Sequence, residues 1–270
     1  MSGPFPLLRK SLSTVILALA TLIGAWAFAY PFFSPQPQGQ LGITAHSTDA
    51  PLTFLILLVL CLVVIIANLE TRQMNSKLVA VLGILTAINS VLRLVPGPAG
   101  FSAIFFLPIL CGYTYGADFG FLLGALSMLV SAVVTGGLGP WLPYQMFSAG
   151  WMGMASAWLP DLRRWGRGEV VFLAVWGALL GLIFGALMNV WFWPYVLGAG
   201  QEMYWQPGLK VWETLGRYAV FYLATSLWWD AGRAGGNLLL ILLLGAPVLR
   251  LLRRFQQRFY FIADGFSVGL

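Results

Sequence analysis

The sequence predicts an all-α, polytopic membrane protein: a helical bundle with a six-helix core and two additional N-terminal membrane helices. The first observation is composition, because 59% of the 270 residues are apolar and only 9% are charged, whereas an average soluble domain is roughly 25% charged. The second is that the apolar residues gather in stretches of about 20, the length of helix that crosses a bilayer. This composition argues against a disordered chain, a nucleic-acid-binding protein and a disulfide-stapled secreted domain.

Eight apolar stretches are expected to form the membrane helices. Charged, proline-containing or glycine-rich segments separate them and mark their ends. In chain order they are Ser11–Phe33, Leu52–Leu69, Leu78–Leu94, Phe101–Gly116, Phe119–Val134, Trp141–Leu159, Val170–Trp193 and Gly235–Leu252. The charged hinge Glu70–Lys77 separates an accessory block of two helices (1–76) from the six-helix core (77–258), and a short C-terminal tail follows (259–270).

The first apolar stretch admits two interpretations. Ala27-Phe28-Ala29 fits a small-x-small cleavage site, so the segment could be a cleaved signal peptide. Its apolar run is long for a signal peptide, and Pro31 lies just beyond the possible cut. We therefore expect an uncleaved membrane anchor.

The cationic residues predict the orientation, because cationic loops stay on the cytoplasmic side of a membrane. With a cytoplasmic N terminus and one crossing for each stretch, 11 of the 15 Lys and Arg residues lie inside. The four at the outer side are Arg93, Lys210, Arg217 and Arg233. Both termini are then cytoplasmic, and Gly216–Trp229 must form an outer-face helix. The alternative, a ninth crossing, would place the basic segment Arg250–Arg258 outside.

Several catalytic motifs are absent from the sequence. It contains no G-x-x-x-x-G-K-[ST] phosphate loop, no H-E-x-x-H, no C-x-x-C and no cluster of carboxylates. His46 is the single histidine, and Cys61 and Cys111 lie inside apolar stretches. We therefore expect no catalytic residues, no metal site and no cofactor, and the sequence favours binding or transport over covalent chemistry.

Small residues recur at intervals of four in the six-helix core. The clearest sets are Gly116, Gly120 and Gly124, then Ala149, Gly153 and Ala157, then Gly177, Gly181 and Gly185. This spacing lines one face of a helix with small side chains, which lets two backbones approach closely in lipid. It predicts helix–helix seams.

Polar side chains near the outer helix ends form the candidate ligand site, because polar groups at membrane depth are costly and often functional. A helix-breaking run of glycines and prolines, Thr135–Gln145, contributes three more candidates. The complete set is Asn89, Arg93, Trp141, Tyr144, Gln145, Asn189, Asp230 and Arg233. In this hypothesis Arg93 would hold an anionic group or a carbonyl, the amides would hydrogen-bond, and the aromatic rings would stack on the ligand.

Structural alternatives remain open for part of this set. Asp230 and Arg233 are three residues apart and could simply pair with each other. The aromatic residues could form an ordinary interfacial belt. The breaks Val95–Phe101 and Thr135–Gln145 lie on the same predicted side, together with a tryptophan-rich loop, and this convergence favours a pocket that opens outward.

Four segments carry a resemblance to a known family. They are Pro96-Gly-Pro-Ala-Gly-Phe-Ser102, Phe105-Phe-Leu-Pro108, Thr135-Gly-Gly-Leu-Gly-Pro-Trp-Leu-Pro-Tyr-Gln-Met146 and Gly150-Trp-Met-Gly153. With the helix before them, they resemble the substrate-binding S component of energy-coupling factor (ECF) vitamin transporters. The similarity covers roughly Lys77–Arg258, the six-helix core.

The resemblance implies a function, a mechanism and partners. Such proteins bind a vitamin from the outer face and dock on a membrane T component that is driven by two cytoplasmic ATPases. In the family, an A-x-x-x-A pattern on the first core helix often contacts the T component. The nearest match here is Gly83-x-x-x-Ala87, with Ala80 preceding it and glycine replacing the first alanine.

We therefore expect a membrane subunit that captures a vitamin-like solute and transfers it through partner-driven reorientation in the lipid bilayer. The many aromatic residues favour a large flat ligand of the cobalamin type. Two other functions stay open. A self-sufficient secondary transporter would need a coupling ion and usually two related halves, and a lipid-modifying membrane enzyme would need a reactive cluster, for which only Asp230 with Arg233 offers a start.

Overall fold

The computed structural model describes residues 6–33, 46–47, 49–70, 74–95, 97, 99–196 and 201–260, and this part of the chain is helical, without strands. The long helices are α1 (Pro6–Ala29), α2 (Ala50–Glu70), α3 (Ser76–Leu92), α4 (Phe106–Tyr115), α5 (Ala117–Thr135), α6 (Leu142–Ser156), α7 (Arg167–Phe192), α8 (Val211–Thr225) and α9 (Leu227–Tyr260). Short 3-10 turns join them at Tyr30–Phe32, Ala103–Phe105, Arg163–Trp165, Trp193–Tyr195 and Gln201–Met203.

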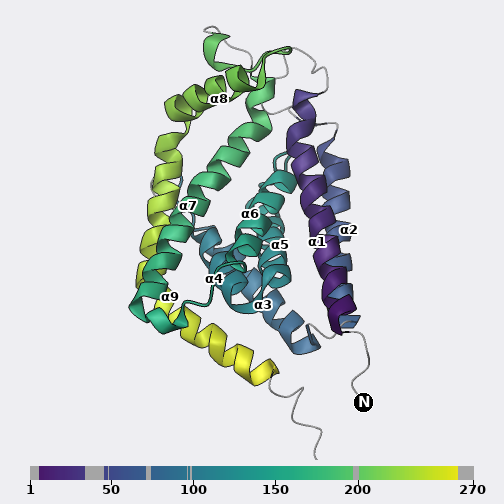
Figure 1. Ribbon diagram of the computed structural model, residues 1–270, viewed down its shortest axis with the longest axis vertical. Helices are drawn as coiled ribbons and strands as arrows, with labels where there is room; N and C mark the ends of the chain where they lie inside the picture. Colours follow the sequence, from purple (N-terminus) through teal and green to yellow (C-terminus); the bar gives the residue numbers. More distant parts are fainter. Residues whose placement is uncertain are drawn as a thin grey trace, which may run out of the picture.

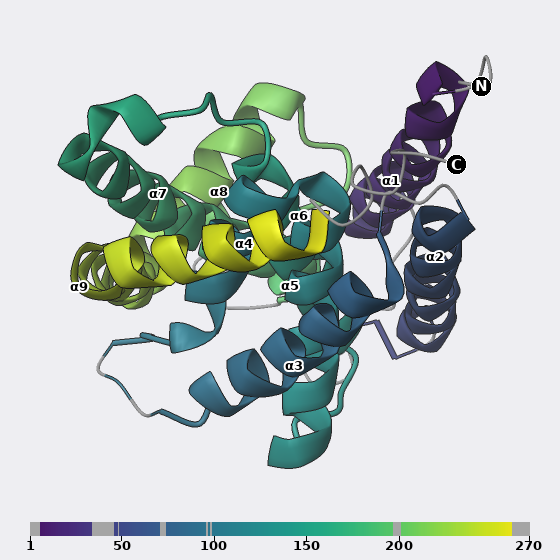
Figure 2. The same ribbon diagram turned by 90° about the horizontal axis from the view of Figure 1, so that it is seen from below.

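The helices form one elongated bundle, in which α1 and α2 stand beside the other helices (Figure 1). Helix α5 packs mainly on α6, and α7 packs mainly on α9. Helix α8 lies at the end of the bundle opposite the start of α1, whereas the last turns of α9 run beneath the bundle at the same end as that start (Figures 1 and 2). The all-α bundle predicted from the sequence is confirmed.

Five helical segments of the described chain are long and apolar enough to cross a membrane, which identifies a multi-pass membrane protein. They are Ser13–Phe32, Ala50–Glu70, Ala117–Thr135, Arg167–Tyr195 and Leu227–Arg258. The other three predicted membrane helices are present but shorter. Helix α3 has 17 residues, α4 has 10 and α6 has 15. Most side chains of α4 and α6 are buried among neighbouring helices, so protein rather than lipid surrounds them.

Glycines set the contact between α5 and α6. A Cβ atom added to Gly120 would lie 2.5 Å from the carbonyl oxygen of Gly153, and one added to Gly124 would meet the backbone of Ala149. Only residues without a side chain allow this approach of the two backbones. Gly116 has a different role, because its φ of 103° makes the turn between α4 and α5.

The second glycine series forms the seam between α7 and α9. Added Cβ atoms at Gly177, Gly181 and Gly185 would meet Ile241, Ala234 and Asp230, respectively. The spacing of four residues therefore predicted both helix seams, and the seam at Gly185 brings α7 against a charged side chain of α9.

The end of the chain differs from the predicted helix bounds. The predicted outer-face helix Gly216–Trp229 ends earlier, because α8 stops at Thr225 and α9 already begins at Leu227. Helix α9 continues through Arg250–Arg258, beyond the predicted end of the last membrane helix at Leu252. Pro247 lies inside α9, where it removes a backbone hydrogen bond of the helix, and α9 turns in this region (Figure 1).

The last turns of α9 are held beneath the bundle by polar contacts. Arg253 pairs with the buried carboxylate of Glu169, which also accepts a hydrogen bond of 2.7 Å from the Tyr113 hydroxyl. The amide of Gln256 donates to the carbonyl of Thr114 at 2.7 Å. These contacts join the end of α4, the start of α7 and the end of α9 at one end of the bundle.

Candidate functional site

The predicted ligand residues all lie toward the end of the bundle opposite the start of α1. They belong to the end of α3, the start of α6, the end of α7 and the start of α9. The structure does not gather them in a single cluster. It divides most of them among three groups, centred on Arg93, on Asp230 and on Tyr144.

The first group is centred on Arg93, the residue that follows α3. Its guanidinium donates to the hydroxyl of Ser131 at 2.9 Å and to the amide oxygen of Gln145 at 3.4 Å. Trp141, on the turn before α6, donates its indole N–H to the carbonyl of Gly137 at 3.2 Å. Arg93 and Gln145 therefore form a polar pair that spans α3 and α6.

Asn89 lies one turn before Arg93 and is fully buried. Its amide nitrogen donates to the carbonyl of Ile104 at 2.8 Å, which ties α3 to the 3-10 turn Ala103–Phe105. Its Oδ1 atom has no hydrogen-bond partner among the described residues. A buried amide oxygen without a donor costs roughly 1–3 kcal/mol, so this atom is available to a ligand or a water molecule.

The second group is centred on Asp230 and Arg233 at the start of α9. The two side chains form an ion pair, and Asp230 is buried. The guanidinium carbon of Arg233 lies 5.2 Å from the ring centre of Phe184 and 6.0 Å from that of Phe105. The pairing that the sequence left open is therefore present, and two aromatic faces hold the cation.

Asn189 lies near the same pair and connects α7 to the junction of α8 and α9. Its Oδ1 accepts a hydrogen bond of 2.9 Å from the hydroxyl of Ser226, and its amide nitrogen donates to the carbonyl of Gly185 at 3.0 Å. Helix α8 contributes Tyr222, whose pKa rises to about 12 because of burial and the nearby charge and hydrogen bond of Asp230. The Tyr222 hydroxyl therefore stays protonated and can donate.

The loop that follows α3 packs over this second group. Added Cβ atoms at Gly232 and Gly236 of α9 would meet Ala99 and Phe101, and one at Gly100 would lie 2.7 Å from the carbonyl oxygen of Trp229. The glycine-containing loop predicted to help enclose a ligand thus packs directly on the start of α9. In this arrangement the candidate site is closed over by protein.

Tyr144 belongs to a third group that the sequence did not predict. It is fully buried, and its hydroxyl lies 2.7 Å from Nδ1 of His46 and donates to Asp49 Oδ2 at 2.8 Å. His46 Nδ1 also lies 2.7 Å from the Asp49 carboxylate, and its Nε2 donates to the carbonyl of Trp191 at 2.8 Å. Tyr144 therefore binds the loop between α1 and α2, which connects the accessory helices to the core.

The residues expected to contact a partner lie on the outside of the bundle. Ala80, Gly83 and Ala87 are exposed on α3, and nothing lies within 4 Å of a Cβ atom added to Gly83. The opposite face of α3 is buried and carries Leu78 and Leu82. This small-residue face is accessible to another membrane protein.

Sequence reasoning missed the partners of the predicted residues. Ser131, Ser226, His46, Asp49 and Phe184 each contact a predicted residue. Each lies 37 or more positions away from that residue in the chain. A histidine and an aspartate three residues apart were the sole local signal.

The fold and these polar groups define a class of protein: a membrane-embedded bundle with three groups of polar side chains toward one end, as expected of a solute-binding membrane subunit. Residues 77–245 match the family described as ECF transporter, substrate-specific component, and the chain belongs to this family. Members are membrane subunits of ECF importers, where they associate with a T component and ATPases, and they are transporter subunits rather than enzymes. No curated protein and no solved structure matches the chain.

Proposed function

We propose that this protein captures a vitamin-like solute at the end of the bundle where Arg93, Asn89 and Arg233 lie, and delivers it inward with a T component and two ATPases. The single observation that carries this proposal is the set of buried polar groups at that end. The Oδ1 atom of Asn89 lacks a donor among the described residues, and the adjacent Arg93–Gln145 bond is long at 3.4 Å. A ligand with hydrogen-bond donors and acceptors would satisfy these groups.

The ligand class follows from the chemistry of the two groups. Arg93 and Arg233 supply cationic donors, Asn89 and Gln145 supply amide groups, and aromatic rings line the second group. These features suit a large ring-containing vitamin with amide or carboxylate substituents, and we favour a cobalamin-like molecule. Because the loop at Gly100 packs on α9, ligand entry requires this loop to move.

The proposed orientation places both termini in the cytoplasm. Helix α8 and the arginine-containing ligand groups then face outward, and the arginine-rich end of α9 faces the cytoplasm. The distribution of Lys and Arg supports this orientation, and so does the position of α8, which lies at one end of the bundle and does not cross it (Figure 1).

Partner docking is proposed for the exposed face of α3 at Ala80, Gly83 and Ala87. Gly83→Leu would add bulk where the structure has open space, so it should impair uptake without impairing ligand binding by the isolated chain. Gly235→Leu is the matched control, because Gly235 of α9 also has open space around it. Equal uptake by the two variants would remove the α3 face from the interface.

The decisive experiment has two steps. Mass spectrometry of small molecules retained after gentle purification identifies the ligand, and we expect a vitamin of the cobalamin class. Uptake is then measured in cells that produce the chain with a T component and either active or inactive ATPases. Loss of uptake with inactive ATPases supports the proposal. Uptake by the purified chain alone, driven by a proton or sodium gradient, would favour a secondary transporter, and turnover of a lipid would favour an enzyme.

A further inference from the structure

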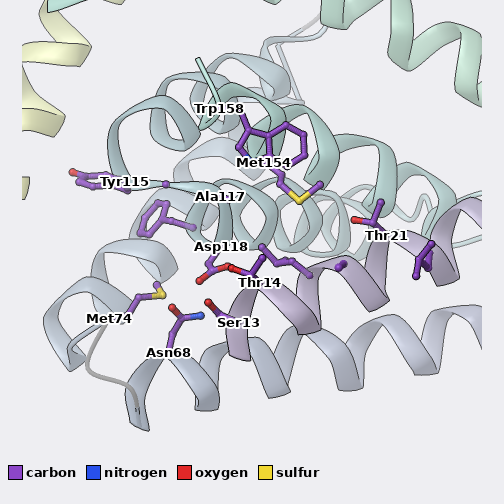
Figure 3. Close-up of a pocket in the computed structure, with 15 residues that line it drawn as sticks. Ser13, Thr14, Thr21, Asn68, Met74, Tyr115, Ala117, Asp118, Met154 and Trp158 are labelled. Carbon is purple, nitrogen blue, oxygen red and sulfur yellow. The ribbon is translucent and has the colours of Figure 1, made fainter. Parts of the chain in front are cut away.

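A cavity of about 870 Å³ lies beside α1, at the end of the bundle remote from the candidate solute site (Figure 1). Figure 3 shows the side chains that line it. Its walls come from residues 13–22 of α1, the end of α2, the turn between α4 and α5, and the end of α6. The accessory helices and the core therefore share this cavity. Its volume lies within the range of small-molecule sites, roughly 300–1,000 Å³.

The packing of α1 explains why the space lies near its start. In its second half α1 is in close contact with α6, because a Cβ atom at Gly24 would meet Trp151 and Phe147. Phe28, one turn further, makes an edge contact with the ring of Tyr144, with ring centres 5.0 Å apart. Nearer its start, α1 lines the cavity instead.

One end of the cavity is polar and carries a carboxylate. Asp118, in the first turn of α5, accepts hydrogen bonds from the side chains of Asn68 and Ser13, both of which are buried (Figure 3). Within the part of the chain whose side chains are described, none of the ion pairs includes Asp118. A ligand with a cationic hydrogen-bond donor would complement this carboxylate.

The rest of the cavity is apolar and follows α1 toward the middle of the bundle. Leu17, Ala18 and Leu22 of α1 line it, opposite Met154 of α6. From Ser13 to Leu22 the helix rises by roughly 13 Å, at about 1.5 Å per residue. Trp158 lines the rim and is 70% exposed, as is typical of tryptophan at a membrane interface. The polar end therefore lies at the level of lipid headgroups and the apolar part at the level of acyl chains.

We propose that this cavity is a binding site for a phospholipid with a primary-ammonium headgroup, of the phosphatidylethanolamine type. The ammonium donates hydrogen bonds to Asp118, and one acyl chain lies along Leu17, Ala18 and Leu22. A choline headgroup has no N–H donor, and a glycerol headgroup leaves the phosphate charge unneutralised beside the carboxylate. The site thus ranks ethanolamine lipid above choline lipid and above phosphatidylglycerol. In the proposed orientation the lipid belongs to the cytoplasmic leaflet and bridges the accessory helices and the core.

The test is native mass spectrometry of the full chain, released from bilayers that contain equal amounts of the three phospholipids. The wild type should retain ethanolamine lipid over the other two by about tenfold, the effect of one charge-assisted hydrogen bond. Asp118→Asn should remove this headgroup preference. Ala18→Phe should fill the apolar part and lower the retention of all three lipids.

Two matched variants serve as controls. Ala25→Phe places the same ring on an exposed position of α1 outside the cavity, and Asp161→Asn neutralises an exposed carboxylate outside it. Both should retain lipid as the wild type does. Equal retention of the three lipids by the wild type, preference for phosphatidylglycerol, or equal retention by Ala18→Phe and Ala25→Phe would overturn the proposal. The order in which the wild type retains the three phospholipids tests the proposal even if Asp118→Asn fails to fold. No partner or vitamin is needed, so failure of the proposed uptake function would leave this result unchanged.

Discussion

The imidazole Nε2 of His46 donates to the backbone carbonyl of Trp191 at 2.8 Å, across 145 positions of the chain. A carbonyl oxygen only accepts, so Nε2 carries a proton in this arrangement. The other ring nitrogen lies 2.7 Å from Asp49 and from the Tyr144 hydroxyl. One histidine of the loop between α1 and α2 is therefore bonded to both α6 and the end of α7, and it joins the accessory helices to the family-defining core.

His46→Ala should loosen the accessory helices. The substitution leaves the carbonyl of Trp191 and the hydroxyl of Tyr144 without His46 as a partner, and each loss costs about 1–3 kcal/mol when the group stays buried. We expect a lower thermal unfolding midpoint in detergent and faster proteolysis between α1 and α2. Ser47→Ala is the control, because Ser47 is the exposed neighbour in the same loop. Equal unfolding midpoints for the two variants would show that His46 does not stabilise the packing of the accessory helices on the core.

The same contact should depend on pH. Burial of Asp49 acts to raise the pKa of its carboxyl, but the hydrogen bond and charge of His46 and the hydrogen bond of Tyr144 together lower it below 3.8. A carboxyl whose pKa is lower in the folded state stabilises that state above its unfolded pKa, and this stabilisation is lost as the pH falls through the folded value. Stability should therefore decrease below about pH 4.

Asp49→Asn isolates the contribution of this carboxyl, since other acidic groups titrate in the same range. The difference in unfolding midpoint between wild type and Asp49→Asn should be largest near neutral pH and should shrink toward about pH 3. Asp161→Asn, which alters an exposed carboxylate near Arg163, should show no such convergence. A constant difference across the whole pH range would contradict the assignment.

Arg93 and Trp141 should contribute to ligand affinity more than to stability. Arg93 is only partly buried, and its partners Ser131 and Gln145 can be solvated or satisfied by other groups after truncation. Arg93→Ala removes a charged donor, which is worth about 1.5–3 kcal/mol or roughly ten- to a hundredfold in Kd. Trp141→Ala removes a ring that would stack on the ligand, with a similar expected loss.

These affinities can be measured by calorimetry with the vitamin identified after purification. Arg254→Ala and Trp165→Ala are matched controls, because both residues are exposed at the other end of the bundle. Unchanged Kd values for Arg93→Ala and Trp141→Ala would remove both residues from the ligand site. A large fall in their unfolding midpoints would instead assign them a structural role.

The helix seams were predictable because their signal is local. Small residues at intervals of four positions indicate which face of a helix allows close approach, and Gly120, Gly153 and Gly181 all lie on such a face. The same holds for the exposed stripe at Gly83, although the spacing alone does not distinguish an internal seam from an external one. That distinction required knowing that the neighbouring Leu78 and Leu82 face inward.

The grouping of the candidate site was not predictable, because it depends on which loop covers which helix end. Tyr144 was expected to face a ligand, but its hydroxyl contacts His46, which lies 98 positions earlier in the chain. The last membrane helix was expected to end at Leu252, and its continuation is stabilised by the pair of Arg253 with Glu169, 84 positions apart. The sequence indicates that these polar side chains lie near the helix ends, but it does not indicate which side chains they contact.

Gly153→Ala should destabilise the contact between α5 and α6 although it adds a single methyl group. An added Cβ atom at Gly153 would overlap the carbonyl of Gly120, and both groups belong to backbone that cannot move aside independently. Overpacking of this kind costs about 1–3 kcal/mol or more, whereas Gly216→Ala adds a methyl group where nothing lies within 4 Å. Alanine also favours helix over glycine by about 1 kcal/mol, so Gly216→Ala should raise the unfolding midpoint slightly while Gly153→Ala lowers it. Because helix propensity favours alanine at both positions, the difference in unfolding midpoint between the two variants measures the steric cost of the methyl group at Gly153. A Gly153→Ala variant as stable as Gly216→Ala would mean that α5 and α6 are not in backbone contact, and the seam at the centre of the bundle would have to be abandoned.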